Sequence, residues 1–248
     1  MGRTFSFLYG VIAYIIFLIS FLYAIPFVGD FLVAKTINTG LETPFGQALL
    51  INLFVLTIFA LQHSIMARHG FKSWWTSIIP KPIERSTYVL LASLALLLIF
   101  WQWRPMGGII WEVQNEAAVA LLYGFYGLGW LIVLLSTFMI NHFELFGLKQ
   151  VYENLKNIEP QPIPFKVSFF YSIVRHPIML GFIIAFWAAP VMTAGRLVFA
   201  MTTTLYILIA IKFLEERDLK KMHGETYIEY QKKVPMVIPF MNRKSEIK

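Results

Sequence analysis

The sequence contains no cysteine and has little charge. Without cysteine, disulfides, thiolate metal sites, a cysteine nucleophile and palmitoylation are all excluded. Only 14% of the 248 residues are charged, compared with about 25% in soluble globular domains. Hydrophobic residues make up 58% and aromatic residues 17% of the chain. This composition excludes a soluble enzyme and predicts an all-α, polytopic transmembrane helical bundle.

Long apolar stretches account for this composition, and most reach the ~17–25 residues that a membrane-spanning helix needs. They predict five to six spans: Phe5–Val28, Phe45–Met66, Ser86–Trp103, Ala117–Ile140, Pro177–Val191 and Leu197–Phe213. The last two are separated by only five residues, so we expect a tight hairpin that either crosses the membrane or is re-entrant. The first stretch is longer than the ~7–15-residue core of a signal peptide, and we expect it to be a retained helix.

Lysine and arginine are distributed unevenly between the connections. Of the 21 such residues, 18 lie at the N-terminus, in the second and fourth connections and in the tail, whereas the other connections hold Lys35, Arg104 and Arg196. The positive-inside rule therefore predicts that both termini are cytoplasmic. The net charge of +7 is then explained by membrane flanks, and we expect no nucleic-acid partner. We expect one membrane domain, with a four-helix part over 1–140 and a second part over 141–248.

Arg175 and His176 come directly before an apolar stretch, and Pro177 suits the first turn of a helix. A helix N-terminus offers N–H groups and partial positive charge to a carboxylate or phosphate. The alternative is that Arg175 reaches the lipid headgroups while His176 caps the helix.

Two adjacent carboxylates, Glu215 and Glu216, follow the last apolar stretch. Such groups at a membrane boundary are costly unless they are paired or functional. Glu216 has lysines at i±4, whereas Glu215 has none, so we expect Glu215 to take the buried role.

The tail predicts a helix from about Lys212 to Met222, a break at Gly224, and a short helical turn that carries Tyr227 and Tyr230. At i, i+3 the two tyrosines share a face, where they either stack on a flat ligand or anchor the tail. Two further groups of prolines break regular structure, in the fourth connection and at the end of the tail: Pro160, Pro162 and Pro164, then Pro235 and Pro239.

Together these segments resemble the C-terminal module of the isoprenylcysteine carboxyl methyltransferase family of membrane methyltransferases. The family pattern is matched by Arg175, His176, Pro177 and Gly181; Glu215, Glu216 and Leu219; Gly224, Tyr227 and Tyr230; and Val234, Pro235, Ile238 and Pro239. The chain departs from the pattern at Met179, where the family has tyrosine. The match covers about 70 residues.

The N-terminal half of the chain restricts the resemblance to a smaller group of membrane proteins. Its distinctive segments are Gln62 to Arg68, Glu84 to Tyr88, Trp101 to Pro105 and Asn141 to Leu148. These are similar to the bacterial membrane-bound methanethiol S-methyltransferases and the related NnrU-like membrane proteins. With the C-terminal module, the similarity covers nearly the whole chain.

The resemblance implies a bacterial inner-membrane enzyme that methylates methanethiol to dimethyl sulfide with S-adenosyl-L-methionine. It implies a donor pocket formed by the hairpin, the preceding loop and the tail, lined by Tyr171, Arg175, His176, Pro177, Glu215, Glu216, Tyr227 and Tyr230. The thiol side is assigned to Gln62, His63, Arg85 and His142. There His142 or His63 takes the thiol proton and Arg85 holds the thiolate.

Simpler interpretations of the thiol-side residues stay open, such as hydrogen bonds between helices for His63 and an ion pair of Glu84 with Arg85. Asn141 and Glu144 share a helix face, and His142 points about 100° away, so at least one of the three faces the interior. Five histidines raise the question of metal or haem, but the chain has no His-x-x-x-His pair, and we expect no metal. Alternative functions are an isoprenylcysteine carboxyl or phospholipid methyltransferase, or a non-catalytic NnrU-like protein.

Overall fold

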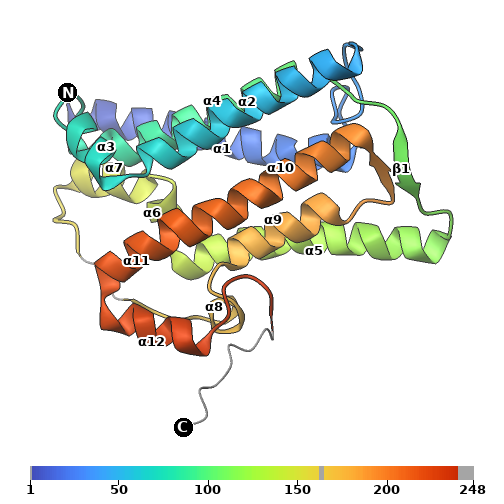
Figure 1. Ribbon diagram of the computed structural model, residues 1–248. Helices are drawn as coiled ribbons and strands as arrows, with labels where there is room; N and C mark the ends of the chain where they lie inside the picture. Colours follow the sequence, from blue (N-terminus) through green and yellow to red (C-terminus); the bar gives the residue numbers. More distant parts are fainter. Residues whose placement is uncertain (1, 162–164, 240–248) are drawn as a thin grey trace, which may run out of the picture. The chain divides into compact units, whose positions relative to one another are not determined.

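A computed structural model describes residues 2–161 and 165–239, and these residues are mostly helical (Figure 1). The contacts divide the chain into two compact units. The first contains Met1–Trp111, Asn141–Pro162 and Val191–Phe199, and the second contains Glu112–Ile140, Ile163–Pro190 and Ala200–Lys248. Each unit therefore combines segments that are far apart in the sequence.

The first unit is built on three long helices. Its elements are α1 (Arg3–Gly29), α2 (Phe45–Met66), α3 (His69–Trp75), η1 (Lys81–Ile83), α4 (Glu84–Gln102), α6 (His142–Leu145) and α7 (Leu148–Lys156). Helix α4 packs against α1 and α2, and α7 packs against α1 (Figure 1). The absence of a side chain at Gly10 allows the last contact, since a Cβ there would lie 2.5 Å from Val151.

The second unit pairs two apolar helices and carries the tail. Its elements are α5 (Glu116–Ile140), α8 (Phe170–Ile173), α9 (Pro177–Trp187), the π-helical turn η2 (Ile211–Glu215), α11 (Glu216–His223) and α12 (Glu225–Lys233). Helix α10 (Ala194–Ala210) begins in the first unit and continues in the second. Helices α5 and α9 lie side by side (Figure 1). They approach closely at Gly129 and Gly181, where an added Cβ would meet the opposing backbone at 2.6 Å.

Two short strands, β1 (Ile109–Glu112) and β2 (Val191–Thr193), pair with each other. The sequence did not predict them, because each is too short for an alternating pattern to stand out from its apolar surroundings. β2 lies in the tight connection that was expected between the last two apolar stretches.

Among the residues that the structure describes, five helices are long and apolar enough to cross a membrane: Arg3–Gly29, Phe45–Met66, Lys81–Gln102, Glu116–Ile140 and Ala194–His223. They confirm the prediction of an all-α polytopic membrane protein, and most ends fall within three residues of the expected ones. Helix α9 is apolar but has only 11 residues, about 16 Å of rise against a hydrocarbon core of ~30 Å. It is too short to cross alone.

The tail has the predicted outline, with α11, a break at Gly224 and then α12. Gly224 has φ +56° and ψ −132°, a conformation that residues with a side chain avoid. In the fourth connection the chain forms α6 and α7, which were not predicted, while Pro160 lies beyond their end. Pro162 and Pro164 lie outside the described residues.

Candidate functional site

Glu216, the first residue of α11, is the centre of a buried polar cluster in the second unit. Its side chain is 9% exposed, yet it accepts hydrogen bonds from four residues. Arg175 donates through Nε at 2.8 Å and Nη2 at 3.0 Å, and His176 Nε2 lies 2.8 Å away. The Tyr227 hydroxyl donates at 2.9 Å, and Gln231 Nε2 also donates. The bidentate contact of Arg175 fixes the orientation of the Glu216 carboxylate and also balances its charge.

His176 lies between two carboxylates. Its Nε2 contacts Glu216, and its Nδ1 contacts Glu215 Oε2 at 3.1 Å. An imidazole can donate from both nitrogens only when it is protonated. Burial on its own lowers the pKa of His176, but hydrogen bonds to Glu215 and Glu216 outweigh it and raise this pKa above its ordinary value. Two cations, Arg175 and His176, then balance two carboxylates.

The same cluster attaches the tail to the start of α9. Arg175 Nη1 donates to the carbonyl oxygens of Gln231, at 3.2 Å, and Val234, at 2.5 Å. The backbone N–H groups of Arg175 and His176 donate to the carbonyls of Pro235 and Met236, at 2.9 and 3.1 Å. Arg175 is therefore buried and does not reach toward lipid headgroups, and His176 makes no side-chain cap on α9.

The expected roles of Glu215 and Glu216 are reversed. Glu216 is buried, whereas the Glu215 side chain is 38% exposed. The expectation compared partners at i±4 along a regular α-helix, but the π-helical turn of η2 ends at Glu215 and changes which side each following residue faces. The partners of Glu216 come instead from the two residues before α9 and from α12, and the spacing of residues around Glu216 does not reveal them.

The aromatic residues of this cluster pack on one another. Phe165 contacts the rings of Tyr227 and Tyr230 at centroid distances of 5.9 and 5.4 Å. The Tyr230 hydroxyl donates to the carbonyl of Tyr171 at 2.5 Å, so both tail tyrosines hold the tail through their hydroxyls. Burial raises the pKa of Tyr230 to about 12 and also raises the pKa values of Tyr171 and Tyr227, so these rings stay neutral.

Pro177 is the first residue of α9, as predicted. The first bond from a helical N–H to a carbonyl four residues earlier runs from Leu180 to His176, at 3.1 Å. The N–H groups of Ile178 and Met179 precede it and point out of the helix end. The geometry thus offers an anion two backbone donors beside the Arg175–His176 pair.

The thiol-side candidates lie in the first unit. His142 is 6% exposed, and its Nε2 lies 2.8 Å from the Tyr14 hydroxyl on α1. Asn141 accepts a hydrogen bond from the Glu144 backbone, and Glu144 forms an ion pair with Lys149 at 2.9 Å. His142 is therefore the member of this segment that faces the interior. Burial lowers its pKa below the ordinary histidine value, which favours a neutral ring that can accept a proton.

His63 pairs with a different tyrosine. The Tyr88 hydroxyl lies 3.0 Å from His63 Nδ1 and 3.1 Å from Nε2. The Arg85 guanidinium lies over the Tyr88 ring, 4.9 Å from its centroid, and donates from Nε to the carbonyl of Leu145 at 2.7 Å. Gln62 Nε2 donates to the sulfur of Met66 at 3.2 Å. Arg85 is thus bound to backbone rather than to Glu84 in the interactions that the structure shows.

Three further residues belong to these clusters and were missed from the sequence: Tyr14, Tyr88 and Gln231. Each is the hydrogen-bond partner of a residue that the sequence did single out, and Tyr14 is 128 positions from His142. The tyrosines lie within apolar stretches, where a single aromatic residue gives no signal. Direct contact with a ligand stays a prediction for every residue of both clusters.

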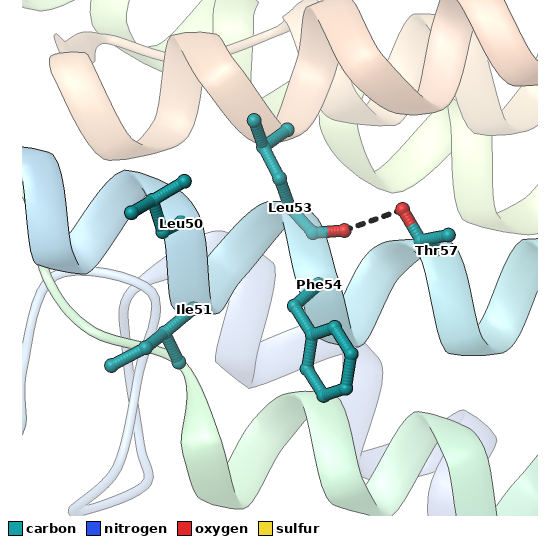
Figure 2. Close-up of a pocket in the computed structure, with 5 residues that line it drawn as sticks. All are labelled: Leu50, Ile51, Leu53, Phe54 and Thr57. Carbon is teal, nitrogen blue, oxygen red and sulfur yellow. Dashed lines mark hydrogen bonds between the residues drawn. The ribbon is translucent and has the colours of Figure 1, made fainter.

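A shallow groove on α2 is lined by Leu50, Ile51, Leu53, Phe54 and Thr57, all from this one helix (Figure 2). Its only side-chain hydroxyl, that of Thr57, donates to the carbonyl of Leu53 at 2.7 Å. Leu50 and Phe54 are 71% and 66% exposed. Apolar side chains exposed on a membrane-spanning helix are suited to contact lipid, so this groove offers nothing to a polar methyl donor. Within the described ranges, no group of three or more histidine, aspartate or glutamate side chains is placed to hold a metal ion.

No family model and no solved structure matches the chain, but several known proteins do. The methanethiol S-methyltransferase of Crocosphaera subtropica is 51% identical over 245 residues, which are 99% of this chain and 96% of that protein. The methanethiol S-methyltransferase of Mycobacterium tuberculosis is 52% identical over 243 residues, 98% of this chain and 99% of that protein. Nurim of Mus musculus is 30% identical over 183 residues, 70% of this chain and 69% of nurim.

Proposed function

Since this chain belongs to the methanethiol S-methyltransferase family, we propose that it methylates methanethiol to dimethyl sulfide, with S-adenosylmethionine as the methyl donor. The observation that carries the proposal is the identity of about half of all residues with such enzymes over nearly the full length of both chains. The alternatives are an isoprenylcysteine carboxyl or phospholipid acceptor, and a protein without catalytic activity.

The donor proposal rests on the polar cluster of the second unit. When bound, S-adenosylmethionine supplies an electrophilic methyl group on a positively charged sulfur. The half-exposed carboxylate of Glu215 has room to accept hydrogen bonds from the donor's ammonium group. The first N–H groups of α9 suit its carboxylate, and the neutral Tyr171 ring offers a flat surface to its base. Arg175, Glu216, Tyr227 and Tyr230 hold the tail in place around this site.

The thiol proposal rests on the polar residues of the first unit. A thiol attacks carbon as its thiolate, so a residue of the chain must remove the proton. His142 is buried and neutral and is our choice for this base, and His63 is the second candidate. Arg85 supplies positive charge that stabilises the thiolate, and Gln62 lies one residue before His63 on α2. Methanethiol is small and apolar, so it partitions into the lipid that surrounds the long helices.

We place both termini in the cytoplasm, in a bacterial inner membrane. Four long helices, α1, α2, α4 and α5, precede the last hairpin. The hairpin returns to its starting level whatever its depth, because Arg175 and His176 at its start contact Glu216 at its end within 2.8 Å. An even number of crossings puts the N-terminus and the tail on the same side, and the excess of lysine and arginine makes that side the cytoplasm.

The test is methyl transfer by the purified, detergent-solubilised protein from S-adenosylmethionine labelled in its methyl group. We expect labelled dimethyl sulfide with methanethiol as acceptor and no labelled product with a farnesylated cysteine analogue or an ethanolamine phospholipid. Turnover of a lipid acceptor alone would replace the proposed substrate. Binding of no donor, measured by equilibrium dialysis, would favour the non-catalytic alternative.

A further inference from the structure

In the pair formed by Tyr14 and His142, the tyrosine is more exposed than the histidine. The hydroxyl oxygen of Tyr14 lies 2.8 Å from Nε2 of His142, and the two rings meet edge to face at 82° with centroids 5.8 Å apart. His142 is 6% exposed, whereas Tyr14 is partly exposed. Tyr14 is therefore the more accessible member of this pair.

The surroundings of His142 are aromatic. Phe143 and Phe146 lie at centroid distances of 5.4 and 4.8 Å from its ring, and Phe146 also stacks on Phe17 at 3.8 Å. An apolar shell of this kind keeps water away and disfavours the charged form of the imidazole. Once a proton arrives, the same ring faces stabilise the cation that forms.

We propose that Tyr14 is a catalytic residue, and that the thiol proton passes to the oxygen of Tyr14 while the proton of Tyr14 passes to Nε2 of His142. This inference rests on the proposed function and deepens it, because it names the group that touches the thiol. The S–H bond of the thiol breaks and an O–H bond forms on Tyr14. The old O–H bond of Tyr14 breaks as an N–H bond forms on His142, which leaves a thiolate and an imidazolium.

The thiolate then attacks the methyl carbon of the sulfonium donor. Its sulfur–carbon bond forms as the donor's sulfur–carbon bond breaks, and the bonding electrons stay on the donor sulfur as a neutral thioether. The imidazolium afterwards returns its proton to water through Tyr14. Tyr14 begins and ends the cycle neutral, so no step requires a free tyrosinate.

In a second pair, formed by His63 and Tyr88, the histidine is instead the more exposed residue. Tyr88 is 6% exposed, whereas His63 is partly exposed, and the Tyr88 hydroxyl lies almost equally far from both ring nitrogens of His63. The Arg85 cation over the Tyr88 ring is also bound to the carbonyl of Leu145. In that pair the histidine is the more accessible residue, so the two pairs make different predictions for tyrosine variants.

The charged groups packed around His142 have partners of their own. On its own segment, Glu144 is paired with Lys149 of α7 at 2.9 Å. From α4, Arg85 donates to the carbonyl of Leu145. From α1, the titratable group that faces His142 is Tyr14 itself. Among these groups, the contact that the structure shows to His142 Nε2 comes from Tyr14.

The experiment compares Tyr14→Phe with Tyr9→Phe in the full-length purified protein. Both tyrosines lie on α1, and the Tyr9 hydroxyl also makes a hydrogen bond, to Thr87 Oγ1 at 3.0 Å. At pH 7 we expect Tyr14→Phe to lower kcat/KM for methanethiol about 100-fold, the usual size of a general-base contribution. We expect Tyr9→Phe to stay within about threefold of the wild type, because its hydroxyl bonds to Thr87 and takes no part in the proposed proton transfer.

The pH profile separates a proton relay from a structural role. Without Tyr14, only thiolate formed in solution reacts, so we expect kcat/KM of Tyr14→Phe to rise about tenfold per pH unit above pH 7, whereas the wild type levels off. His142→Gln gives the same profile, and the double variant is no slower than either single variant, because the two residues act as one unit.

Three results would overturn the proposal: full activity of Tyr14→Phe, an equal loss at every pH, or losses in the double variant that multiply. If His63→Gln lost most of its activity while Tyr14→Phe remained active, the proton acceptor would be His63 of the His63–Tyr88 pair. Absence of thiol methylation by the wild type would instead refute the proposed function. The activity of the wild type is therefore measured before that of any variant.

Discussion

Glu216 shows how strongly one buried carboxylate depends on its partners. Five donor atoms converge on it, two of them from Arg175. Removing one member of a buried ion pair leaves the other charge without compensation, which typically costs about 3–5 kcal/mol. Glu215, one residue earlier, contacts His176 but remains half exposed.

We therefore predict different consequences for the two glutamates. Glu216→Gln should lower the free energy of unfolding by about 3 kcal/mol, because it leaves Arg175 buried without its counter-charge. Glu215→Gln should change stability by less than about 1 kcal/mol but weaken donor binding at least tenfold. Thermal unfolding in detergent and equilibrium dialysis with labelled donor measure the two effects. Equal destabilisation by both variants would contradict the assignment of Glu216 as the structural member.

His176 makes the attachment of the tail sensitive to pH. Its pKa is raised in the folded protein by Glu215 and Glu216, against the opposing effect of burial. A raised pKa means that the folded state holds the proton more tightly than the unfolded state does. The stabilisation is complete below the unfolded value of about 6.5 and is lost as pH rises through the higher, folded value.

We predict that Tm of the wild type falls between pH 6.5 and 9 by more than Tm of His176→Gln does. The variant keeps a hydrogen-bond donor at this position but does not titrate, so the difference between the two curves isolates His176. Parallel curves would show that the histidine does not carry the charge assigned to it here.

Among the elements, α5 and α9 pack most closely where both carry glycine. A Cβ at Gly129 would lie 2.6 Å from the carbonyl oxygen of Gly181 and 2.7 Å from the backbone nitrogen of Ala185. Small residues at such a crossing allow two membrane helices to bring their backbones together. This contact positions α9, which the cluster residues Arg175 and His176 directly precede.

We predict that Gly129→Ala destabilises the protein by about 1–3 kcal/mol, because the two helices must separate to admit one methyl group. Gly127→Ala is the matched control on the same helix, since nothing lies within 4 Å of a Cβ there. The control should be neutral or stabilising by up to about 1 kcal/mol, since alanine favours helix over glycine. Thermal unfolding of both variants in the same detergent measures the difference, and equal Tm values would contradict close packing at Gly129.

The long helices were predictable and the short elements were not. A long, continuous apolar stretch is by itself enough to predict a membrane-spanning helix. Helix α2 accordingly begins and ends at the predicted residues, Phe45 and Met66. The ribbon of β1 and β2 and helices α6 and α7 depend on contacts with distant segments. Such contacts cannot be predicted from hydropathy along the sequence.

At the scale of the whole molecule, the natural lack of cysteine makes the proposed sidedness directly testable. Single cysteines can be placed at Gly107, in the third connection, and at Lys156, at the end of α7, both of which are exposed. In intact cells, we predict that a membrane-impermeant maleimide labels Gly107→Cys and leaves Lys156→Cys unlabelled. Lysed cells serve as the control, because both positions should then react. The reverse pattern would place the termini outside the cytoplasm.

Most members of the polar cluster around Glu216 were singled out from the sequence, but the network that joins them was not predictable. The motif around Arg175 and the pair Glu215–Glu216 were recognised by their order and spacing. Which glutamate is buried depends on a π-helical turn and on donors more than 40 positions away, such as Arg175. Tyr14 was missed for the same reason, because a hydrogen bond across 128 positions leaves no local pattern.

The convergence of the start of the hairpin and of α12 on one carboxylate of α11 has a consequence for evolution and engineering. Substitutions at Arg175, His176, Glu216, Tyr227 and Gln231 should show strong epistasis, since four of these side chains bond to the carboxylate of the fifth, Glu216. A chimera that exchanges the tail between homologues must therefore carry the start of α9 with it. Directed evolution of the thiol range would do better to diversify the first unit and leave this interdependent set untouched.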